Sequence, residues 1–122
     1  MKEGKDLLEK DPVLRRIVEV IVKEIDPDRI ILFGSRARGD YDEGSDYDIL
    51  VLKKGVRPEE RRRLEGRIYL SLRSLGVPVE IFVQDSGKYE ELKDKWFLFY
   101  YDVEREGRVI YDRRKAMAGV RL

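Results

Sequence analysis

Residues 30–52 read IILFGSRARGDYDEGSDYDILVL, and this stretch decides the fold of the chain. An apolar run that ends in Gly34-Ser35 is typical of a buried strand leading into a tight turn with an accessible backbone. Ten residues separate Ser35 from Asp46, where the triplet DYD opens a second apolar run. Because strand side chains alternate between two faces, Asp46 and Asp48 are expected on the same face. The stretch therefore predicts two strands, with paired carboxylates at the start of the second.

The paired aspartates predict a metal site. Asp48 shares its strand face with Leu50 and Leu52, so its carboxylate needs a metal ion, an arginine or hydrogen bonds to offset the cost of burial. The plainer alternative, in which the acids cap a loop and begin a strand, accounts for one acid but not for Asp48. A calcium loop of the EF-hand type does not fit, because residues 40–45 have the wrong register. Two acids beside an anion-accepting turn suit divalent ions that carry a nucleoside triphosphate, so we expect phosphoryl-transfer chemistry.

The turn between the strands is the predicted phosphate site. Gly34 permits close approach of the backbone, and the amides and hydroxyl at Ser35 can donate to phosphate oxygens. The alternative is an ordinary strand-to-helix turn capped by a serine. Arg36 and Arg38 are candidates for neutralising phosphates, and they are equally well explained as solvent-facing charges. No Walker loop occurs in the sequence.

The absence of two residue types narrows the chemistry. The chain has no cysteine and no histidine, which excludes disulfides, thiolate nucleophiles, zinc–sulfur sites and serine–histidine triads. Any metal must be bound by oxygen ligands, so Mg²⁺ is expected, with Mn²⁺ as the alternative. The net charge of +1 gives no reason to expect nucleic acid as a partner. The arginines of residues 57–67 alternate with glutamates, which favours a solvated, salt-bridged helix face.

The length and hydropathy predict one domain. A chain of 122 residues is long enough for one core but not for two. No stretch approaches the ~20 apolar residues that cross a bilayer, and the N-terminus lacks the apolar segment of a signal peptide. We therefore expect a cytoplasmic protein without a membrane segment.

The pattern of apolar residues predicts an α+β sandwich, in which helices cover a small mixed sheet. Helices are expected over residues 12–25, 35–38, 58–75 and 88–106. Strands are expected over residues 29–33, 46–53, 77–83 and 108–111, the last of them at the edge of the sheet. Residues 113–122 read as a basic tail.

The spacing of Gly-Ser, ten residues and Asp-x-Asp, together with the sequence GSRARG at residues 34–39, resembles the minimal nucleotidyltransferases. These are small members of the superfamily that includes DNA polymerase β, and the resemblance spans roughly residues 10–112. It implies the palm-like fold of that superfamily, ATP as the substrate, two Mg²⁺ ions and transfer of AMP to a hydroxyl.

The resemblance also implies a third metal-site carboxylate on the next core strand, and Glu80 takes that place. The family most often has aspartate there. One extra methylene shifts the carboxylate, and a positioning error near ~1 Å can reduce a rate about 10²-fold. The alternative role for Glu80 is a structural ion pair with an arginine.

The chain is too short to carry an acceptor-binding domain, so the acceptor is expected on another protein. The resemblance implies a helical HEPN-domain partner, with the two proteins acting as antitoxin and toxin and AMP transferred to a partner tyrosine. The surplus aromatic residues of 96–101 are the candidate docking surface. Two alternatives remain: a non-catalytic module that neutralises its partner by docking, and a small-molecule adenylyltransferase of the aminoglycoside type.

Overall fold

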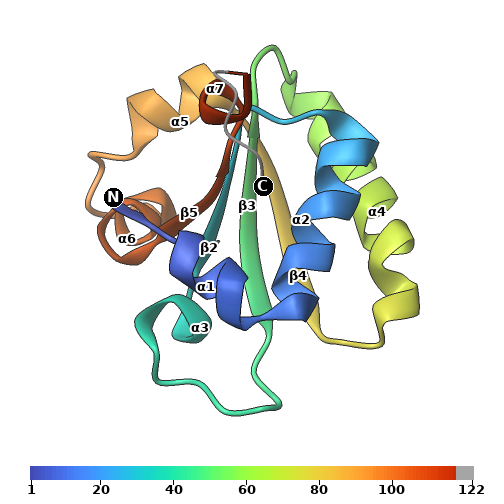
Figure 1. Ribbon diagram of the computed structural model, residues 1–122. Helices are drawn as coiled ribbons and strands as arrows, with labels where there is room; N and C mark the ends of the chain where they lie inside the picture. Colours follow the sequence, from blue (N-terminus) through green and yellow to red (C-terminus); the bar gives the residue numbers. More distant parts are fainter. Residues whose placement is uncertain (118–122) are drawn as a thin grey trace.

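The computed structural model describes residues 1–117 and shows a mixed five-stranded sheet between two groups of helices (Figure 1). The strands are β1 (Lys2–Glu3), β2 (Arg29–Phe33), β3 (Tyr47–Lys53), β4 (Val79–Asp85) and β5 (Arg108–Asp112). The α-helices are α1 (Lys5–Lys10), α2 (Pro12–Ile25), α3 (Ser35–Arg38), α4 (Arg61–Leu72), α5 (Ser86–Leu92), α6 (Phe99–Glu106) and α7 (Arg113–Met117). Two 3₁₀ turns, η1 (Pro58–Glu60) and η2 (Arg73–Leu75), flank α4.

The strand order is β1-β5-β2-β3-β4. β2 pairs antiparallel with both β3 and β5, whereas β4 pairs parallel with β3 and β1 pairs parallel with β5. This arrangement confirms the α+β prediction. The strand predicted at the edge, β5, lies instead between β1 and β2, because the two-residue β1 pairs with its outer side.

Helices α2 and α4 lie side by side on one face of the sheet (Figure 1). Asp11 caps α2, since its Oδ1 accepts hydrogen bonds from the amides of Val13 and Leu14 at 3.0 and 3.1 Å. The helices bury apolar stripes at helical spacing against the sheet: Leu14, Ile17, Ile21 and Ile25 from α2, and Leu64, Ile68 and Leu72 from α4. Hydrophobic burial on this face makes the larger of the two cores.

The opposite face has a smaller core under α5 and α6. Ile31, Leu50 and Leu52 project from the strands and pack against Tyr89 of α5 and Tyr100 and Val103 of α6. These helices cover only part of the face. The end of β3 that carries Asp48 is left half-open.

Residues 88–106 do not form the single helix that was predicted. The chain leaves the helical path after Leu92 and turns at residues 93–98, where Lys95 N donates to Leu92 O at 3.0 Å and Leu98 N donates to Lys95 O at 2.9 Å. The break folds α6 back, so that the rings of Tyr89 and Tyr100 meet edge to face, 5.9 Å apart, above the same strands. A straight helix of this length would span ~28 Å and carry one of these rings away from the core.

Smaller differences concern the ends of predicted elements and short elements that were not predicted. Helical structure near residues 58–75 is α-helical only over Arg61–Leu72, and β4 begins and ends two residues later than predicted. β1 and α1 were not predicted at all. The beginning of the basic tail forms α7, and the rest of the predicted tail, residues 118–122, lies outside the described residues.

Candidate active site

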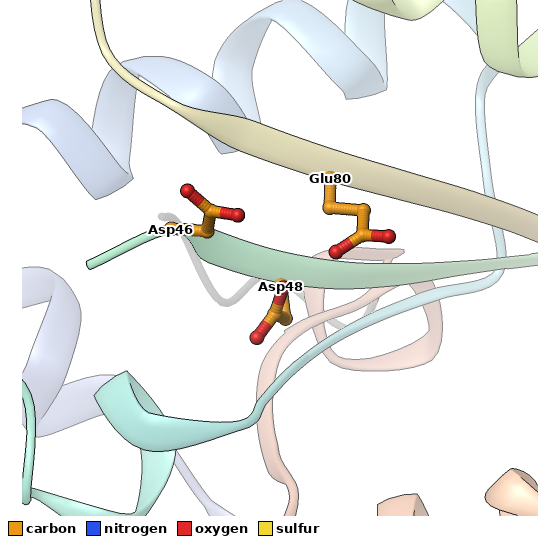
Figure 2. A group of neighbouring side chains, drawn as sticks. All are labelled: Asp46, Asp48 and Glu80. Atoms are coloured by element: carbon orange, nitrogen blue, oxygen red, sulfur yellow. The ribbon is translucent and has the colours of Figure 1, made fainter.

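The three predicted acids come together on the half-open face of the sheet. Asp48 pairs with Phe33 of β2 on one side and with Glu80 of β4 on the other, so these side chains form one row across three strands. Asp46 lies one residue before β3 and shares the face of Asp48. Figure 2 shows the three carboxylates around the start of β3, and one oxygen from each lies within 4.8 Å of the others.

The electrostatics of this cluster favour a cation. Partial burial, with the neighbouring carboxylates of Glu80 and Asp46, raises the pKa of Asp48 from 3.8 to about 6. Burial and the close like charges therefore both disfavour the ionised state that a metal ligand must have. A divalent cation would reverse this penalty, because it interacts favourably with every carboxylate in the cluster.

The donor set fits Mg²⁺ or Mn²⁺. All three side chains supply carboxylate oxygens, the ligands these hard ions prefer, and the exposure of Asp46 and Glu80 leaves room for water and phosphate oxygens as further ligands. Glu80 makes no ion pair within residues 1–117. This observation argues against its alternative role in a structural salt bridge.

Gly34 allows the turn to pass close to the carboxylates. Its backbone has φ 72° and ψ −159°, a region that is accessible essentially to glycine alone. A Cβ atom at this position would lie 2.2 Å from Oδ2 of Asp48 and 3.1 Å from its Cγ. The turn thus passes against the central carboxylate with no space for a side chain, so a phosphate bound at the turn would lie next to the acids.

Ser35 begins α3 directly after this turn, and the buried Ala37 fixes the short helix against the core. Arg36, a predicted phosphate ligand, is held by the loop in this structure. Its Nε donates to Ser45 O at 3.0 Å, and its guanidinium lies 4.0 Å from the ring centroid of Tyr47 and 4.6 Å from that of Tyr41. These contacts fasten residues 39–45 to the start of β3, so phosphate binding by Arg36 stays a prediction.

Arg38 is exposed and paired with acids. It contacts Asp40 at 3.3 Å and Glu106 at 3.1 Å, and its hydrogen bond to Asp40 raises the pKa of the guanidinium. Phosphate binding by Arg38 also stays a prediction, and it would require exchange of these partners.

Behind the site, Tyr47 anchors the start of β3. Its hydroxyl donates to Oδ2 of Asp11 at 2.8 Å, and burial together with this carboxylate raises its pKa to about 12. Tyr47 is the buried residue between the two exposed or half-exposed aspartates. The sequence analysis assigned it no role. Strand alternation, which puts Tyr47 on the face opposite Asp46 and Asp48, is the signal that could have indicated its burial.

The sequence analysis also missed three aromatic rings beside the acids. Phe33, Phe82 and Phe99 contact one another, with ring centroids 5.4–6.1 Å apart. Alternation along β4 could have placed Phe82 on the face of Glu80. Phe99 comes from α6, and no local pattern in the sequence predicts that it meets them.

A family model described as "Nucleotidyltransferase domain" matches residues 14–111, which includes the turn and all three acids. The chain belongs to the nucleotidyltransferase domain family. The family that the motif predicted is thereby confirmed.

Two relatives are proteins of Methanocaldococcus jannaschii, each named "Putative protein adenylyltransferase". One is 37% identical over 83 residues, which cover 68% of this chain and 77% of the relative. The other is 74% identical over 27 residues, which cover 22% of this chain and 27% of the relative. Identity to the second relative is thus confined to a short segment.

Solved structures of the same fold support the assignment. A putative nucleotidyltransferase from Sulfolobus solfataricus superposes with a TM-score of 0.62 and 26% identity, over 85% of this chain and 81% of that one. A toxin–antitoxin crystallised with AMP-PNP has a TM-score of 0.56 and 20% identity, over 84% and 75% of the two chains. A mutant of the toxin–antitoxin MntA-HpeT has a TM-score of 0.55 and 18% identity, over the same shares. At these identities the last two show the fold alone.

Within residues 1–117, no helix has the length and apolar character needed to cross a membrane.

Proposed function

We propose that this protein transfers AMP from ATP, in the presence of Mg²⁺, to a hydroxyl group of a partner protein. One observation carries the proposal: the carboxylates of Asp46, Asp48 and Glu80 meet beside a turn at Gly34 that has no room for a side chain. Carboxylates and an accessible backbone are the two elements that hold a metal-bound triphosphate.

In this proposal Asp46, Asp48 and Glu80 hold up to two Mg²⁺ ions, which when bound neutralise phosphate charge and lower the pKa of the acceptor hydroxyl. The backbone and hydroxyl of Ser35 orient the β- and γ-phosphates. The acceptor oxygen bonds to the α-phosphorus while the bond from that phosphorus to the bridging oxygen breaks, and pyrophosphate leaves. The exposed carboxylate of Glu80 accepts the hydroxyl proton.

The acceptor belongs to a second protein in this proposal. Two relatives are named protein adenylyltransferases, and two similar folds come from toxin–antitoxin structures. The chain itself exposes Trp96 by 77% and Phe97 by 66%, in the turn before α6. Exposed aromatic residues are enriched at the cores of protein interfaces. We assign this pair to docking of a helical HEPN-domain toxin that presents a tyrosine, so that AMP transfer serves as the antitoxin reaction.

The first test is ligand binding. Mg²⁺-ATP should raise the melting temperature of the wild-type protein, because a ligand that binds only the native state stabilises it. Asp48→Asn should remove most of this rise, and Lys10→Gln, a change on α1, serves as a control that should retain it. Equal stabilisation of wild type and Asp48→Asn would contradict the metal assignment.

The second test is transfer. The protein is mixed with a HEPN-domain protein encoded by a neighbouring reading frame, Mg²⁺ and ATP, and the partner is analysed by intact-mass spectrometry. Wild type should add one or more AMP groups, and tryptic peptides should place them on tyrosine. Asp46→Ala/Asp48→Ala should still bind the partner and leave its mass unchanged. Neutralisation of the toxin by both forms without a mass change would instead establish a non-catalytic docking module.

A further inference from the structure

Three phenylalanine rings lie next to the carboxylates; Phe33 and Phe82 are half-buried, and Phe99 is exposed. Phe33 belongs to the same cross-strand row as Asp48 and Glu80, and Phe82 follows Glu80 by two residues on the same face of β4. Successive side chains on one strand face lie ~6.6 Å apart, so the rings border the acids directly. Phe99 is 40% exposed, and its ring centroid lies 5.4 Å from that of Phe82 and 6.1 Å from that of Phe33.

Buried residues support the cluster of Phe33, Phe82 and Phe99 on its inner side. Phe99 lies against Tyr100, with centroids 4.2 Å apart, and the Tyr100 hydroxyl accepts hydrogen bonds from Gln84 at 2.8 Å and from Arg61 at 3.3 Å. Tyr100 and Gln84 are both buried. The exposed part of the cluster is therefore fixed by a buried hydrogen-bonded network, as expected of a surface preorganised for a ligand.

A groove of about 360 Å³ continues from Phe82 over the outer edge of β4. Its other walls come from the start of α4 and the turn before it: Pro58, Glu59, Arg61, Arg62 and Glu65. Two of these side chains are held by the strand, since Arg61 Nε donates to Val83 O at 2.8 Å and Val83 N donates to a Glu65 carboxylate oxygen at 2.9 Å. The groove thus combines the ring of Phe82 with the charged side chains of Glu59, Arg61, Arg62 and Glu65. An aromatic ring and hydrogen-bonding groups are what a nucleobase contacts, through its π-face and its polar edge.

We propose that the base of the nucleoside triphosphate stacks on the exposed surface of the Phe82–Phe99 pair and enters this groove. The inference rests on the proposed function, because it takes the triphosphate to lie between the Gly34 turn and the carboxylates. The base is separated from the α-phosphate only by the ribose, and the rings are the aromatic surface adjoining the acids. Stacking on an aromatic side chain suits every base, because each has a π-face.

Calorimetric titration of Mg²⁺-ATP against Mg²⁺-tripolyphosphate tests the proposal, because tripolyphosphate has the phosphates without the base. Wild type should bind ATP about 5- to 150-fold more tightly, the range that stacking of one base provides. Tripolyphosphate carries the higher negative charge, so charge alone would favour the opposite order. Phe99→Ala should remove most of the ATP advantage and leave tripolyphosphate binding unchanged.

Two controls accompany this variant. Tyr69→Ala removes an exposed aromatic ring from α4 that lines neither the cluster nor the groove, so it should change neither affinity. Phe99→Tyr keeps the ring and should keep the ATP advantage. Nuclear Overhauser effects between adenine protons and phenylalanine ring protons in the wild-type complex give a second readout that requires no folded variant.

The outcomes separate the two proposals. If neither ligand binds, the proposed function fails, and this inference with it. If tripolyphosphate binds as tightly as ATP, the function stands and the base subsite is refuted, which would leave the rings for the acceptor. An ATP advantage that survives Phe99→Ala, without contacts between the base and the rings, would place the base elsewhere and also refute the inference.

Discussion

Replacement of Gly34 by alanine should destabilise the protein and abolish Mg²⁺-ATP binding together. The substitution has two costs. The alanine must adopt a φ of 72° with ψ near the extended range, and its Cβ would lie 2.2 Å from Oδ2 of Asp48. The carboxylate can only yield by rotating away from its place between the turn and Glu80. A single methyl group should therefore disturb both the backbone and the central acid.

The two costs can be estimated separately. A non-glycine residue in this backbone region costs ~1–3 kcal/mol. The forced contact adds ~1–3 kcal/mol, the usual range for an extra carbon in a packed site. We expect Gly34→Ala to reduce the free energy of unfolding by about 2–6 kcal/mol, measured by urea denaturation without metal.

Gly76→Ala is the matched control. Gly76 also has a positive φ, 65°, but a Cβ there meets nothing within 4 Å. This variant should lose only the ~1–2 kcal/mol of a left-handed backbone and should retain its stabilisation by Mg²⁺-ATP.

A double-mutant cycle isolates the contact. In an Asp48→Ala background the carboxylate is absent, so Gly34→Ala should cost ~1–3 kcal/mol less than it does in the wild type. Additive effects of the two substitutions, or a loss no larger than that of Gly76→Ala, would refute the reasoning that the turn is pressed against Asp48.

Other perturbations probe the charges of the site. The pKa of Asp48 is raised from 3.8 to about 6 in the folded protein, so the folded state favours the protonated carboxyl. The stability that Asp48 contributes is therefore fully present below pH 3.8 and is lost as the pH rises through about 6. Metal-free melting temperatures should fall over this window. Asp48→Asn should flatten that fall and raise metal-free stability at pH 7 by ~1–2 kcal/mol after allowance for partial exposure; a lower stability would contradict the charge repulsion. Glu80→Gln should reduce AMP transfer by ~10²-fold or more with little change in urea unfolding, whereas a loss of ~3 kcal/mol would indicate a buried ion pair instead. Arg36→Lys should loosen residues 39–45, seen as faster proteolysis there, because lysine cannot reproduce a guanidinium between two rings; unchanged cleavage would dismiss the role of Arg36 in holding the loop.

Strand periodicity made the acids predictable. Asp46 and Asp48 had to share a face because they are two residues apart, and Glu80 lay in a run that reads as the next core strand. The structure brings the three together because β4 pairs in parallel with β3, with Glu80 opposite Asp48. Their roles in metal binding and catalysis remain predictions.

The contacts that sequence reasoning missed are made between distant segments. The break at residues 93–98 follows from the meeting of Tyr89 and Tyr100 over the sheet, and helical periodicity alone does not indicate a reversal. β1 has only two residues, and the segment is held by contacts such as the 2.7 Å hydrogen bond from Gly4 N to Val109 O. Arg36 was read as a phosphate ligand because its position in the motif is visible in the sequence, whereas its place between Tyr41 and Tyr47 is not.

The hydrogen bond between Tyr47 and Asp11 also sets the alignment of β3. Asp11 uses one carboxylate oxygen to cap α2 and the other to accept from the Tyr47 hydroxyl. A slip of β3 by one residue would turn Tyr47 toward the solvent face and Asp48 into the large core, since strand side chains alternate. The first turn of α2 therefore acts as a stop that fixes which residues of β3 reach the opposite face. Asp11 lies 35 positions before Asp46 and on the other side of the sheet. Its side chain thus helps to determine that acids, and not a tyrosine, lie beside Gly34.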